Sequence, residues 1–242
     1  MSENALVDKT AIVTGASRGI GKAVALALAA QGARVMLVAR SEADLLGVRA
    51  EIEAQGGRAW VAPADVSCEE AVRAVAQQAR EQLGHVDVLV NSAGIGVFGP
   101  LLNTSTEDWD RVMAINARGP FLVSREVVPL MPAGGCIVNV ASVVGVKGYV
   151  NQGAYSASKH ALMGFTKVLA QEVQRLGIRV HVVCPGGVDT DLAKQARPDL
   201  DTSDLMTPPE IAELVLFLIN QRGRAIVDQL NVRRANAAPW FS

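Results

Sequence analysis

The chain has 242 residues, and its 23 Lys and Arg nearly balance its 24 Asp and Glu, which gives a net charge of −1. Charges of both signs are interspersed, so the sequence offers no basic surface for nucleic acid or an anionic membrane. We therefore expect neither as a partner. No stretch resembles a linker, and single α/β domains commonly reach about 250 residues. These features favour one domain spanning residues 1–242.

Cysteine usage and the N-terminal segment both indicate a cytoplasmic protein. Cys68, Cys136 and Cys184 lie far apart in the sequence, without the spacing of a disulfide framework or a zinc site. The segment Met1–Lys9 lacks the apolar core of a signal peptide. No apolar run reaches the roughly 18 residues that a membrane span needs. We expect no metal and no membrane contact.

Apolar, β-branched runs recur along the chain and predict buried strands. They cover Thr10–Thr14, Arg34–Ala39, Arg58–Ala62, Val86–Asn91, Cys136–Ala141, Ile178–Cys184 and Ala225–Val232. The segments between them have helical periodicity, namely Ile20–Gln31, Ser41–Gln55, Glu69–Leu83, Thr106–Pro129, Ala154–Leu176 and Pro208–Gln221. Such alternation predicts right-handed βαβ crossovers, in either an open doubly wound sheet or a closed barrel.

A glycine-rich turn after the first strand favours the open sheet. It reads Thr14-Gly15-Ala16-Ser17-Arg18-Gly19-Ile20-Gly21 and opens a predicted helix. Glycines let the backbone approach a pyrophosphate, whose charge the helix N-terminus stabilises. A Walker A loop would need glycine at position 16 and Ser or Thr at 23, where the chain has Ala16 and Ala23. The turn predicts dinucleotide binding by Gly15, Ser17, Arg18, Gly19, Ile20 and Gly21.

With this turn the chain resembles the short-chain dehydrogenase/reductase family, whose shorter members carry T-G-x-x-x-G-x-G. Further matches follow in order: Asp65-Val66 resembles an adenine-contacting pair, Asn91-Ser92-Ala93-Gly94 the N-N-A-G motif, and the segment from Pro185 to Thr190 the P-G-x-x-x-T nicotinamide turn. Ser92 departs from the second Asn of N-N-A-G. The resemblance spans about residues 8 to 232. It implies a Rossmann-type α/β fold, doubly wound, with seven mostly parallel strands and helices on both faces. It also implies cofactor contacts from Asp65, Val66, Asn91, Ala93, Gly94, Pro185, Gly186, Val188 and Thr190.

The end of the second predicted strand indicates NADP(H) rather than NAD(H). An acidic residue about 20 positions beyond the turn would bond the ribose 2′-OH and repel a 2′-phosphate. Ala39 stands there instead, followed by Arg40 and Ser41. Arg40, with Arg18 in the glycine turn, has the charge to bind that phosphate.

The residues for carbonyl chemistry follow on a predicted helix. Tyr155 and Lys159 are four apart, so they share one face. An ammonium close to a phenol lowers the phenol's pKa, and we expect this to let Tyr155 act as general acid in reduction and general base in oxidation. Ser142, at the end of a predicted strand, is placed to hydrogen-bond the substrate oxygen. By the family resemblance, Lys159 also holds the nicotinamide ribose, and Asn116 supports a water-linked proton relay.

The remaining polar signals are weaker. His85, His160 and His181 show neither metal-ligand spacing nor a nucleophile partner, so we expect surface or packing positions. Two other functions are compatible with the glycine turn. One is a cofactor-sensing or scaffolding protein without turnover, and the other is an epimerase or dehydratase of longer relatives. The catalytic set argues against the first, and the short C-terminal region argues against the second.

Apolar side chains are expected around the substrate, an uncharged carbonyl compound. We assign substrate contacts to Val143, Tyr149 and Gln152, with Ile95, Val97, Phe98 and Val144 nearby. Within the family, the residues Ser142 to Gly145 and Gln152 resemble the 3-oxoacyl-[acyl-carrier-protein] reductases, so a 3-oxoacyl thioester is the leading substrate. The chain departs from these reductases in the short stretch from Ala193 to Pro209 and in lacking a V-D-G-G close.

Two further features concern motion and assembly. Residues 191–209, with their loop-like part Pro198–Pro209, are interpreted as a flap over the site. The predicted helix Ala154–Leu176 is apolar on more than one side. This surplus apolar surface predicts a homo-oligomer, either a dimer or a tetramer.

Overall fold

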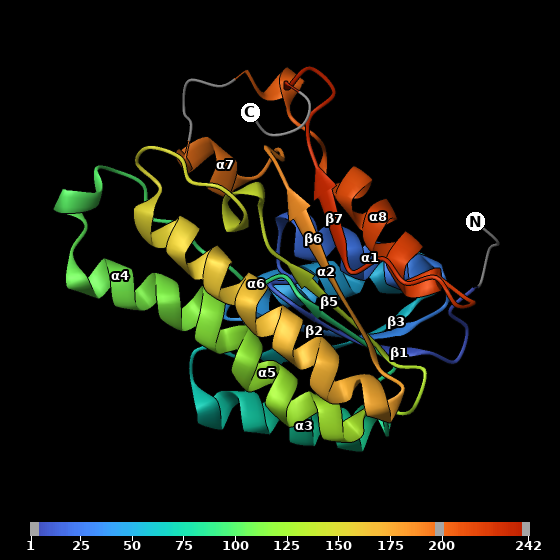
Figure 1. Ribbon diagram of the computed structural model, residues 1–242. Helices are drawn as coiled ribbons and strands as arrows, with labels where there is room; N and C mark the ends of the chain where they lie inside the picture. The colour runs from blue at the N-terminus through green and yellow to red at the C-terminus, as the bar shows by residue number, and fades with distance from the viewer. Residues whose placement is uncertain (1–4, 197–200, 239–242) are drawn as a thin grey trace.

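The computed structural model describes residues 5–196 and 201–238, and a seven-stranded sheet forms its centre (Figure 1). The strand order is β3-β2-β1-β4-β5-β6-β7, and every neighbouring pair is parallel. The strands are β1 (Thr10–Thr14), β2 (Arg34–Ala39), β3 (Arg58–Pro63), β4 (Val88–Asn91), β5 (Cys136–Val140), β6 (Arg179–Pro185) and β7 (Gln229–Val232). The predicted doubly wound α/β fold is confirmed, with a sheet that is wholly rather than mostly parallel.

Helices cover both faces of this sheet. They are α1 (Gly19–Ala30), α2 (Glu42–Ala54), α3 (Glu69–Leu83), α4 (Thr106–Met113), α5 (Gly119–Val127), α6 (Gly153–Val173), α7 (Asp191–Ala196) and α8 (Pro208–Asn220). One buried cluster joins the sheet to α1, α2 and α8, and another joins it to α3, α5 and α6 (Figure 1). Burial on both faces explains why the strands are apolar at consecutive positions rather than alternating.

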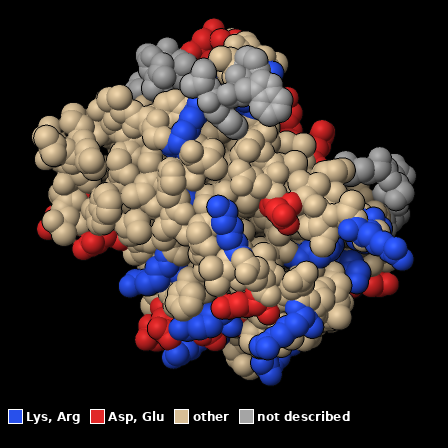
Figure 2. All heavy atoms as spheres, viewed as in Figure 1, with Lys and Arg blue, Asp and Glu red and all other residues tan. Residues whose placement is uncertain are grey.

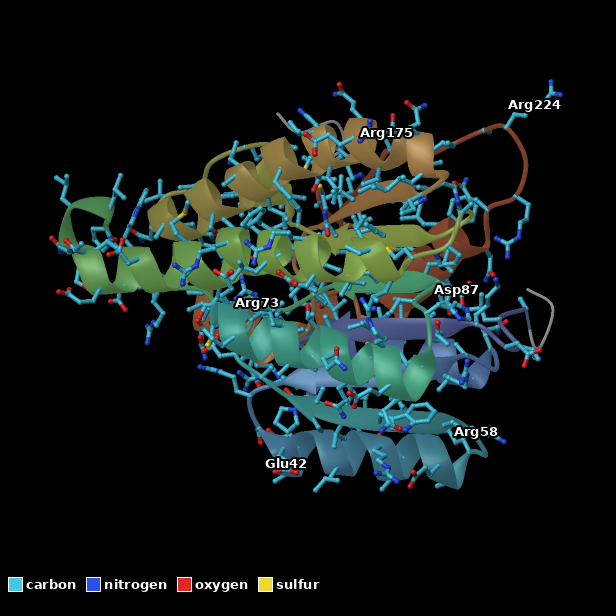
Figure 3. The ribbon with its side chains drawn as sticks, turned by 90° about the horizontal axis from the view of Figure 1, so that it is seen from below. Glu42, Arg58, Arg73, Asp87, Arg175 and Arg224 are labelled. Carbon is cyan, nitrogen blue, oxygen red and sulfur yellow. The ribbon has the colours of Figure 1, made fainter. Side chains whose placement is uncertain are left out.

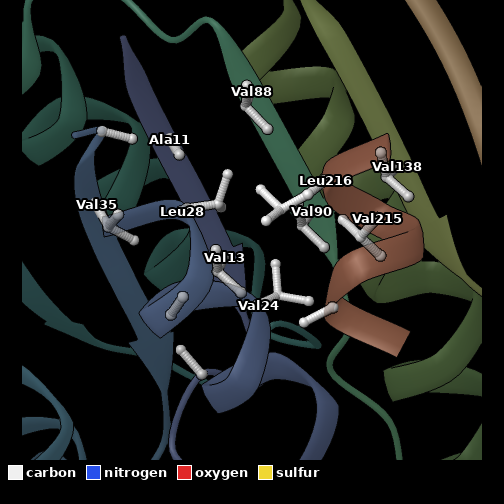
Figure 4. Packing of buried hydrophobic residues seen from close by; sticks show 14 of the residues in the cluster. Ala11, Val13, Val24, Leu28, Val35, Val88, Val90, Val138, Val215 and Leu216 are labelled. Carbon is white, nitrogen blue, oxygen red and sulfur yellow. The ribbon is translucent and has the colours of Figure 1, made fainter. Parts of the chain in front are cut away.

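The packing between α1 and α8 fixes the first helix over the sheet. Val24 and Leu28 of α1 lie against Val215 and Leu216 of α8, with Val13 of β1 beneath them (Figure 4). All five side chains are buried. The direction of α1, and with it the position of its N-terminus, therefore depends on its packing against α8 and β1.

Serine side chains cap the N-termini of α2 and α4. Ser41 accepts a hydrogen bond from the Asp44 N–H at 3.3 Å, and Ser105 accepts one from the Asp108 N–H at 3.1 Å. Each cap satisfies a backbone donor that the first turn leaves unpaired. Ser105 is therefore the N-cap of α4, directly before Thr106.

The predicted helix Thr106–Pro129 is interrupted. A π-helical turn, Ala114–Arg118, separates α4 from α5, and a 3₁₀ turn follows at Val128–Leu130. Pro120 explains the break, because it has no N–H to bond the carbonyl of Asn116 four residues earlier. Turns of this kind are frequent at functional sites.

Two of the predicted strands are too long by two or more residues, while the others match to within one residue at each end. The predicted strand Ala225–Val232 is ordered into the sheet only as β7, Gln229–Val232. The fourth strand begins at Val88 rather than Val86. In both cases the apolar residues extend beyond the part of the strand that is hydrogen-bonded to its neighbour.

The amino ends of the strands carry a buried polar cluster. Asp87 lies at this end of the sheet. Glu42, at the start of α2, lies at the other end (Figure 3). The Asp87 carboxylate accepts hydrogen bonds from Lys9 Nζ at 2.9 Å and from the Thr10 N–H at 3.0 Å. Burial acts to raise the pKa of Asp87, but these hydrogen bonds outweigh it and hold the pKa below its ordinary value. His85 contacts the same carboxylate at 3.0 Å, so it has a structural position far from the carboxyl ends of the strands.

No helix in the described ranges is both long and apolar enough to cross a membrane. The three cysteines are free, with Cys68 exposed and Cys136 and Cys184 buried.

Candidate active site

A cleft of about 890 Å³ opens at the carboxyl ends of β1 and β4, where the strand order reverses direction. Open α/β sheets bind ligands at such a switch point. The cleft is large enough for a dinucleotide-sized ligand. Most predicted cofactor residues line it, namely Gly15, Ser17, Arg18, Gly19, Ile20, Gly21, Arg40, Ser41, Asp65, Val66, Ala93, Gly94, Tyr155, Lys159 and Thr190.

Backbone contact at the glycine turn shapes the floor of the cleft. Gly15 has φ +68°, and a Cβ there would lie 2.8 Å from the backbone N of Ala93. A Cβ on Gly21 would fall inside contact distance of the Gly15 carbonyl. Thr14 Oγ1 also accepts hydrogen bonds from the Ser92 and Ala93 N–H groups, both at 3.1 Å. At Gly15 the turn therefore meets the end of β4 backbone to backbone, the Thr14 hydroxyl bonds the two segments together, and the N-terminus of α1 faces the space above.

The charge at the far end of the cleft comes from Arg40, Asp65 and the ion pair between Arg18 and Asp191. Arg40 is exposed beside Asp65, and within the described part of the chain it makes no ion pair shorter than 4 Å. Burial acts to raise the pKa of Asp65, but hydrogen bonds from Ser67, together with the nearby Arg40, hold it below its ordinary value. Arg18 pairs with Asp191 at 3.0 Å, and both side chains are largely exposed. An ionised Asp65 and an unpaired Arg40 are thus available to a ligand.

Asn116 fastens the π-helical turn to two neighbouring segments. Its Oδ1 accepts from the Ile95 N–H at 2.9 Å, and its Nδ2 donates to the Ile95 carbonyl at 2.8 Å. The same Nδ2 donates to Ser158 Oγ at 3.0 Å, and that hydroxyl donates to the Tyr155 carbonyl at 2.7 Å. One buried amide therefore links the segment after β4 to the helix that carries Tyr155 and Lys159.

Tyr155 and Lys159 line the inner end of the cleft, and Ser142 lies behind this lining, beside Tyr155. Lys159 Nζ donates to the Val140 carbonyl at 3.0 Å and lies 5.8 Å from the centre of the Tyr155 ring. Ser142 Oγ donates to the Pro185 carbonyl at 3.3 Å and is a hydrogen-bond partner of the Tyr155 phenol. The site thus places a phenol, a hydroxyl and an amine together, as the sequence predicts.

The expectation for the Tyr155 pKa is wrong in direction. Burial raises the pKa of Tyr155 to about 12, and the hydrogen bond from Ser142 opposes only part of this rise. Burial also lowers the pKa of Lys159 to about 8. The Lys159 ammonium donates to the Val140 carbonyl rather than to the phenol. Desolvation of the phenol therefore outweighs the ammonium charge, which we expected to lower the pKa of Tyr155.

Several predicted site residues lie elsewhere. Asn91 is in the core, donating to Asn139 Oδ1 at 2.9 Å, and Pro185, Gly186 and Val188 do not line the cleft. Tyr149 is 46% exposed, with the Lys147 ammonium 4.9 Å from its ring centre. Val143 is buried and packs against Tyr155, outside the cleft lining. Gln152 precedes α6 and lies beside Gly99 in an isolated bridge.

The described part of residues 191–209, the segment predicted to be a flap, contributes residues to the cleft that were not predicted individually. Leu192, Lys194 and Gln195 of α7 line it, as do Pro208 and Pro209 at the start of α8. Leu192, Lys194 and Gln195 come directly after the P-G-x-x-x-T segment, and this position was the sequence signal for their place in the cleft. The part of the predicted flap at residues 197–200 lies outside the described residues.

The sheet order and the backbone cradle define this chain as a nucleotide-binding α/β protein of the Rossmann type. Residues 9–201 match the family model described as short chain dehydrogenase. The chain belongs to the short-chain dehydrogenase/reductase family, and it is an oxidoreductase of that family.

Individual relatives differ in the substrates that their names give. A 3-oxoacyl-[acyl-carrier-protein] reductase of Synechocystis sp. is 39% identical over 231 residues, covering 92% of this chain and 94% of the relative. A 3beta-hydroxysteroid dehydrogenase of Mediterraneibacter gnavus is 41% identical over 197 residues, covering 81% of this chain and 71% of the relative. The crystal structure of a short chain dehydrogenase from Burkholderia cenocepacia in complex with NADP superposes with a TM-score of 0.88 at 36% identity, covering 97% of this chain and 100% of the other.

The buried Lys159 predicts a stability that depends on pH. Its pKa is about 8 in the folded protein against 10.5 in the unfolded chain, so stability falls as the pH falls from 10.5 to 8, where only the unfolded chain takes up the proton. The cost, about 3 kcal/mol, is fully present at pH 7. Lys159→Met, which loses one hydrogen bond, should raise the free energy of unfolding by about 1 to 3 kcal/mol at pH 7 and by less at pH 10, measured by urea denaturation. The control Lys167→Met, exposed on the same helix, should change neither value, and a Lys159→Met variant less stable at both pH values would contradict the prediction.

Proposed function

We propose that the protein is an NADPH-dependent carbonyl reductase that converts a ketone or a 3-oxoacyl thioester to the alcohol. The observation that carries this proposal is the presence of Tyr155 and Lys159 in the lining of a dinucleotide-sized cleft, with Ser142 beside the Tyr155 phenol. Bound NADPH would supply the hydride for the carbonyl carbon. The residues proposed to hold it are the glycine turn, Arg40, Ser41, Asp65 and Thr190.

The raised pKa of Tyr155 suits the reductive direction. A phenol with a pKa of about 12 is protonated at neutral pH, so it can donate its proton to the carbonyl oxygen as negative charge develops there. The Ser142 hydroxyl, beside that phenol, is placed to hydrogen-bond the same oxygen. Lys159, with a pKa of about 8, keeps a positive charge near the developing oxyanion. Asn116 holds the helix of Tyr155 in register with the cleft and, by the family resemblance, supports a proton relay through water.

The 3-oxoacyl thioester remains the leading substrate. It is supported by the resemblance of Ser142 to Gly145 and of Gln152, and by relatives whose names give this activity. The free cysteines support the assignment to the cytoplasm.

Tyrosine variants test the proposed reaction, because the chain has only two tyrosines. Tyr155→Phe should lower kcat by about 10² to 10⁴ for NADPH-dependent reduction of an acetoacetyl thioester, since the general acid is lost. NADPH binding, followed by fluorescence, should stay near the wild-type value. The control Tyr149→Phe should retain turnover. Tight NADPH binding by a wild-type protein that reduces no ketone would support the sensor alternative instead.

The preference for NADP(H) over NAD(H) is proposed from Ala39 and Arg40. Arg40 is free to pair with a 2′-phosphate, and Ala39 places no carboxylate against it. The NADP bound to the Burkholderia cenocepacia protein supports the assignment.

The double variant Ala39→Asp/Arg40→Gln should shift the ratio of kcat/KM for NADPH over NADH toward NADH by about tenfold to a hundredfold. This is the effect of losing one hydrogen-bonded charge pair. Arg224→Gln, at an exposed arginine remote from the cleft, serves as the control. An unchanged ratio in the double variant would refute the role of Arg40.

We propose a homo-oligomer with α6 at its interface. Val168 of α6 and Phe121 of α5 are exposed apolar side chains on this face, and the first turns of α6 show few charges (Figure 2). Burying such a surface is favourable in an oligomer. Light scattering should give the mass of two or four chains, and Val168→Glu should lower it. A monomeric wild-type protein would contradict the proposal.

A further inference from the structure

The glycine turn lies between the end of β2 and the segment that leads into α7. On one side of it, the Ala16 N–H donates to the Val38 carbonyl at 3.2 Å. On the other side, a Cβ at Gly19 would lie 3.2 Å from Cγ2 of Thr190. Arg18 stands between these two contacts in the sequence. Its long side chain therefore has a possible partner segment on either side of the turn.

The guanidinium of Arg18 is turned toward α7. Its Nη1 lies 3.0 Å from Oδ2 of Asp191, and the two side chains are 72% and 59% exposed. Lys194, on the same helix, pairs with Asp189 at 3.0 Å. Within the described part of the chain, no cation other than Arg18 lies within 4 Å of the Asp191 carboxylate. All four residues line the cleft, so this ion pair joins two sides of the cofactor site.

The β2 side of the turn is where the 2′-phosphate of NADPH is proposed to bind. Arg40 follows β2 directly, and Arg18 and Arg40 both line the cleft. A phosphate monoester carries a charge of about −1.5 to −2 at neutral pH and accepts two hydrogen bonds from one guanidinium. The Asp191 carboxylate carries a single charge, and exposure to water weakens its attraction for Arg18. The phosphate is therefore the stronger partner for the guanidinium.

We propose that Asp191 competes with the 2′-phosphate for Arg18 and so lowers the preference of the protein for NADPH over NADH. In the free protein, Arg18 pairs with Asp191. When NADPH binds, the guanidinium exchanges the carboxylate for the phosphate, and Asp191 is left to water. NADH has no 2′-phosphate, so the ion pair persists when it binds. Asp191 thus determines cofactor specificity through Arg18, and this inference rests on the NADPH-dependent function proposed above.

Titrations with NADPH and with NADH, followed by cofactor fluorescence, test the exchange. Asp191→Asn should lower the Kd for NADPH by about twofold to fivefold, because Arg18 no longer has to leave a carboxylate, and the Kd for NADH should not change. Arg18→Gln should raise the Kd for NADPH alone. The control Asp204→Asn removes the same charge at an exposed position outside the cleft lining and should change neither Kd.

A double variant separates competition for Arg18 from a general effect of charge. In the Arg18→Gln background, Asp191→Asn should no longer change the Kd for NADPH, because the guanidinium for which carboxylate and phosphate compete is absent. Tighter NADPH binding that persists in this background would overturn the competition. It would then come from the removal of a negative charge near the phosphate, without any exchange of partners.

Other results would overturn the exchange and leave the NADPH-dependent function standing. Unchanged NADPH binding by Asp191→Asn would mean that the ion pair does not oppose the phosphate. Weaker binding of NADPH and NADH alike would mean that the pair holds the cleft around either cofactor. A wild-type protein that binds neither cofactor would overturn the proposed function, and the exchange with it. Circular dichroism checks folding, and Asp191→Ala, which also removes the carboxylate, should behave as Asp191→Asn.

Discussion

The direct backbone contact between the glycine turn and the end of β4 is the constraint on which the site depends. Gly15 leaves no Cβ in this contact with Ala93, and Gly21 leaves none between the first turn of α1 and the Gly15 carbonyl. A side chain at either glycine would push α1 away from the sheet, although its packing on α8 holds it there. The cleft opens at this point, with helix N–H groups on one side and the segment leading to Ile95 on the other. An anionic ligand at the switch point therefore gains the field of α1 without a large side chain intervening.

Asn116 connects this part of the cleft to the helix that carries Tyr155 and Lys159. Its amide joins Ile95, just beyond the cradle, to Ser158 on α6. The π-helical turn places this amide, and Pro120 explains the turn.

The arrangement of the site also has an energetic cost. Lys159 is buried at a depressed pKa, so the site stores unfavourable free energy that the packed cores on both faces of the sheet offset.

The sequence was sufficient for the features that depend on local pattern. Continuous apolar runs such as Cys136–Val140 identify buried parallel strands, and the glycine spacing identifies the backbone cradle at the first turn. The π-helical turn was missed because the apolar periodicity of Thr106–Pro129 continues through it, while Pro120 alone signals the break. The pKa of Tyr155 was given the wrong direction, since burial depends on Phe98 and Leu192, which are distant in sequence. Asn91 belongs to a matched motif, yet its side chain serves the core, because a motif residue need not face the ligand.

The central claim is that this chain transfers hydride from NADPH to a carbonyl carbon. The most direct test is to supply NADPH labelled with deuterium at either C4 position and to analyse the alcohol product by mass spectrometry. The claim predicts an alcohol that carries deuterium on the carbinol carbon from one of the two labelled forms and not from the other. An unlabelled alcohol with both forms, or no alcohol from any ketone, would contradict it.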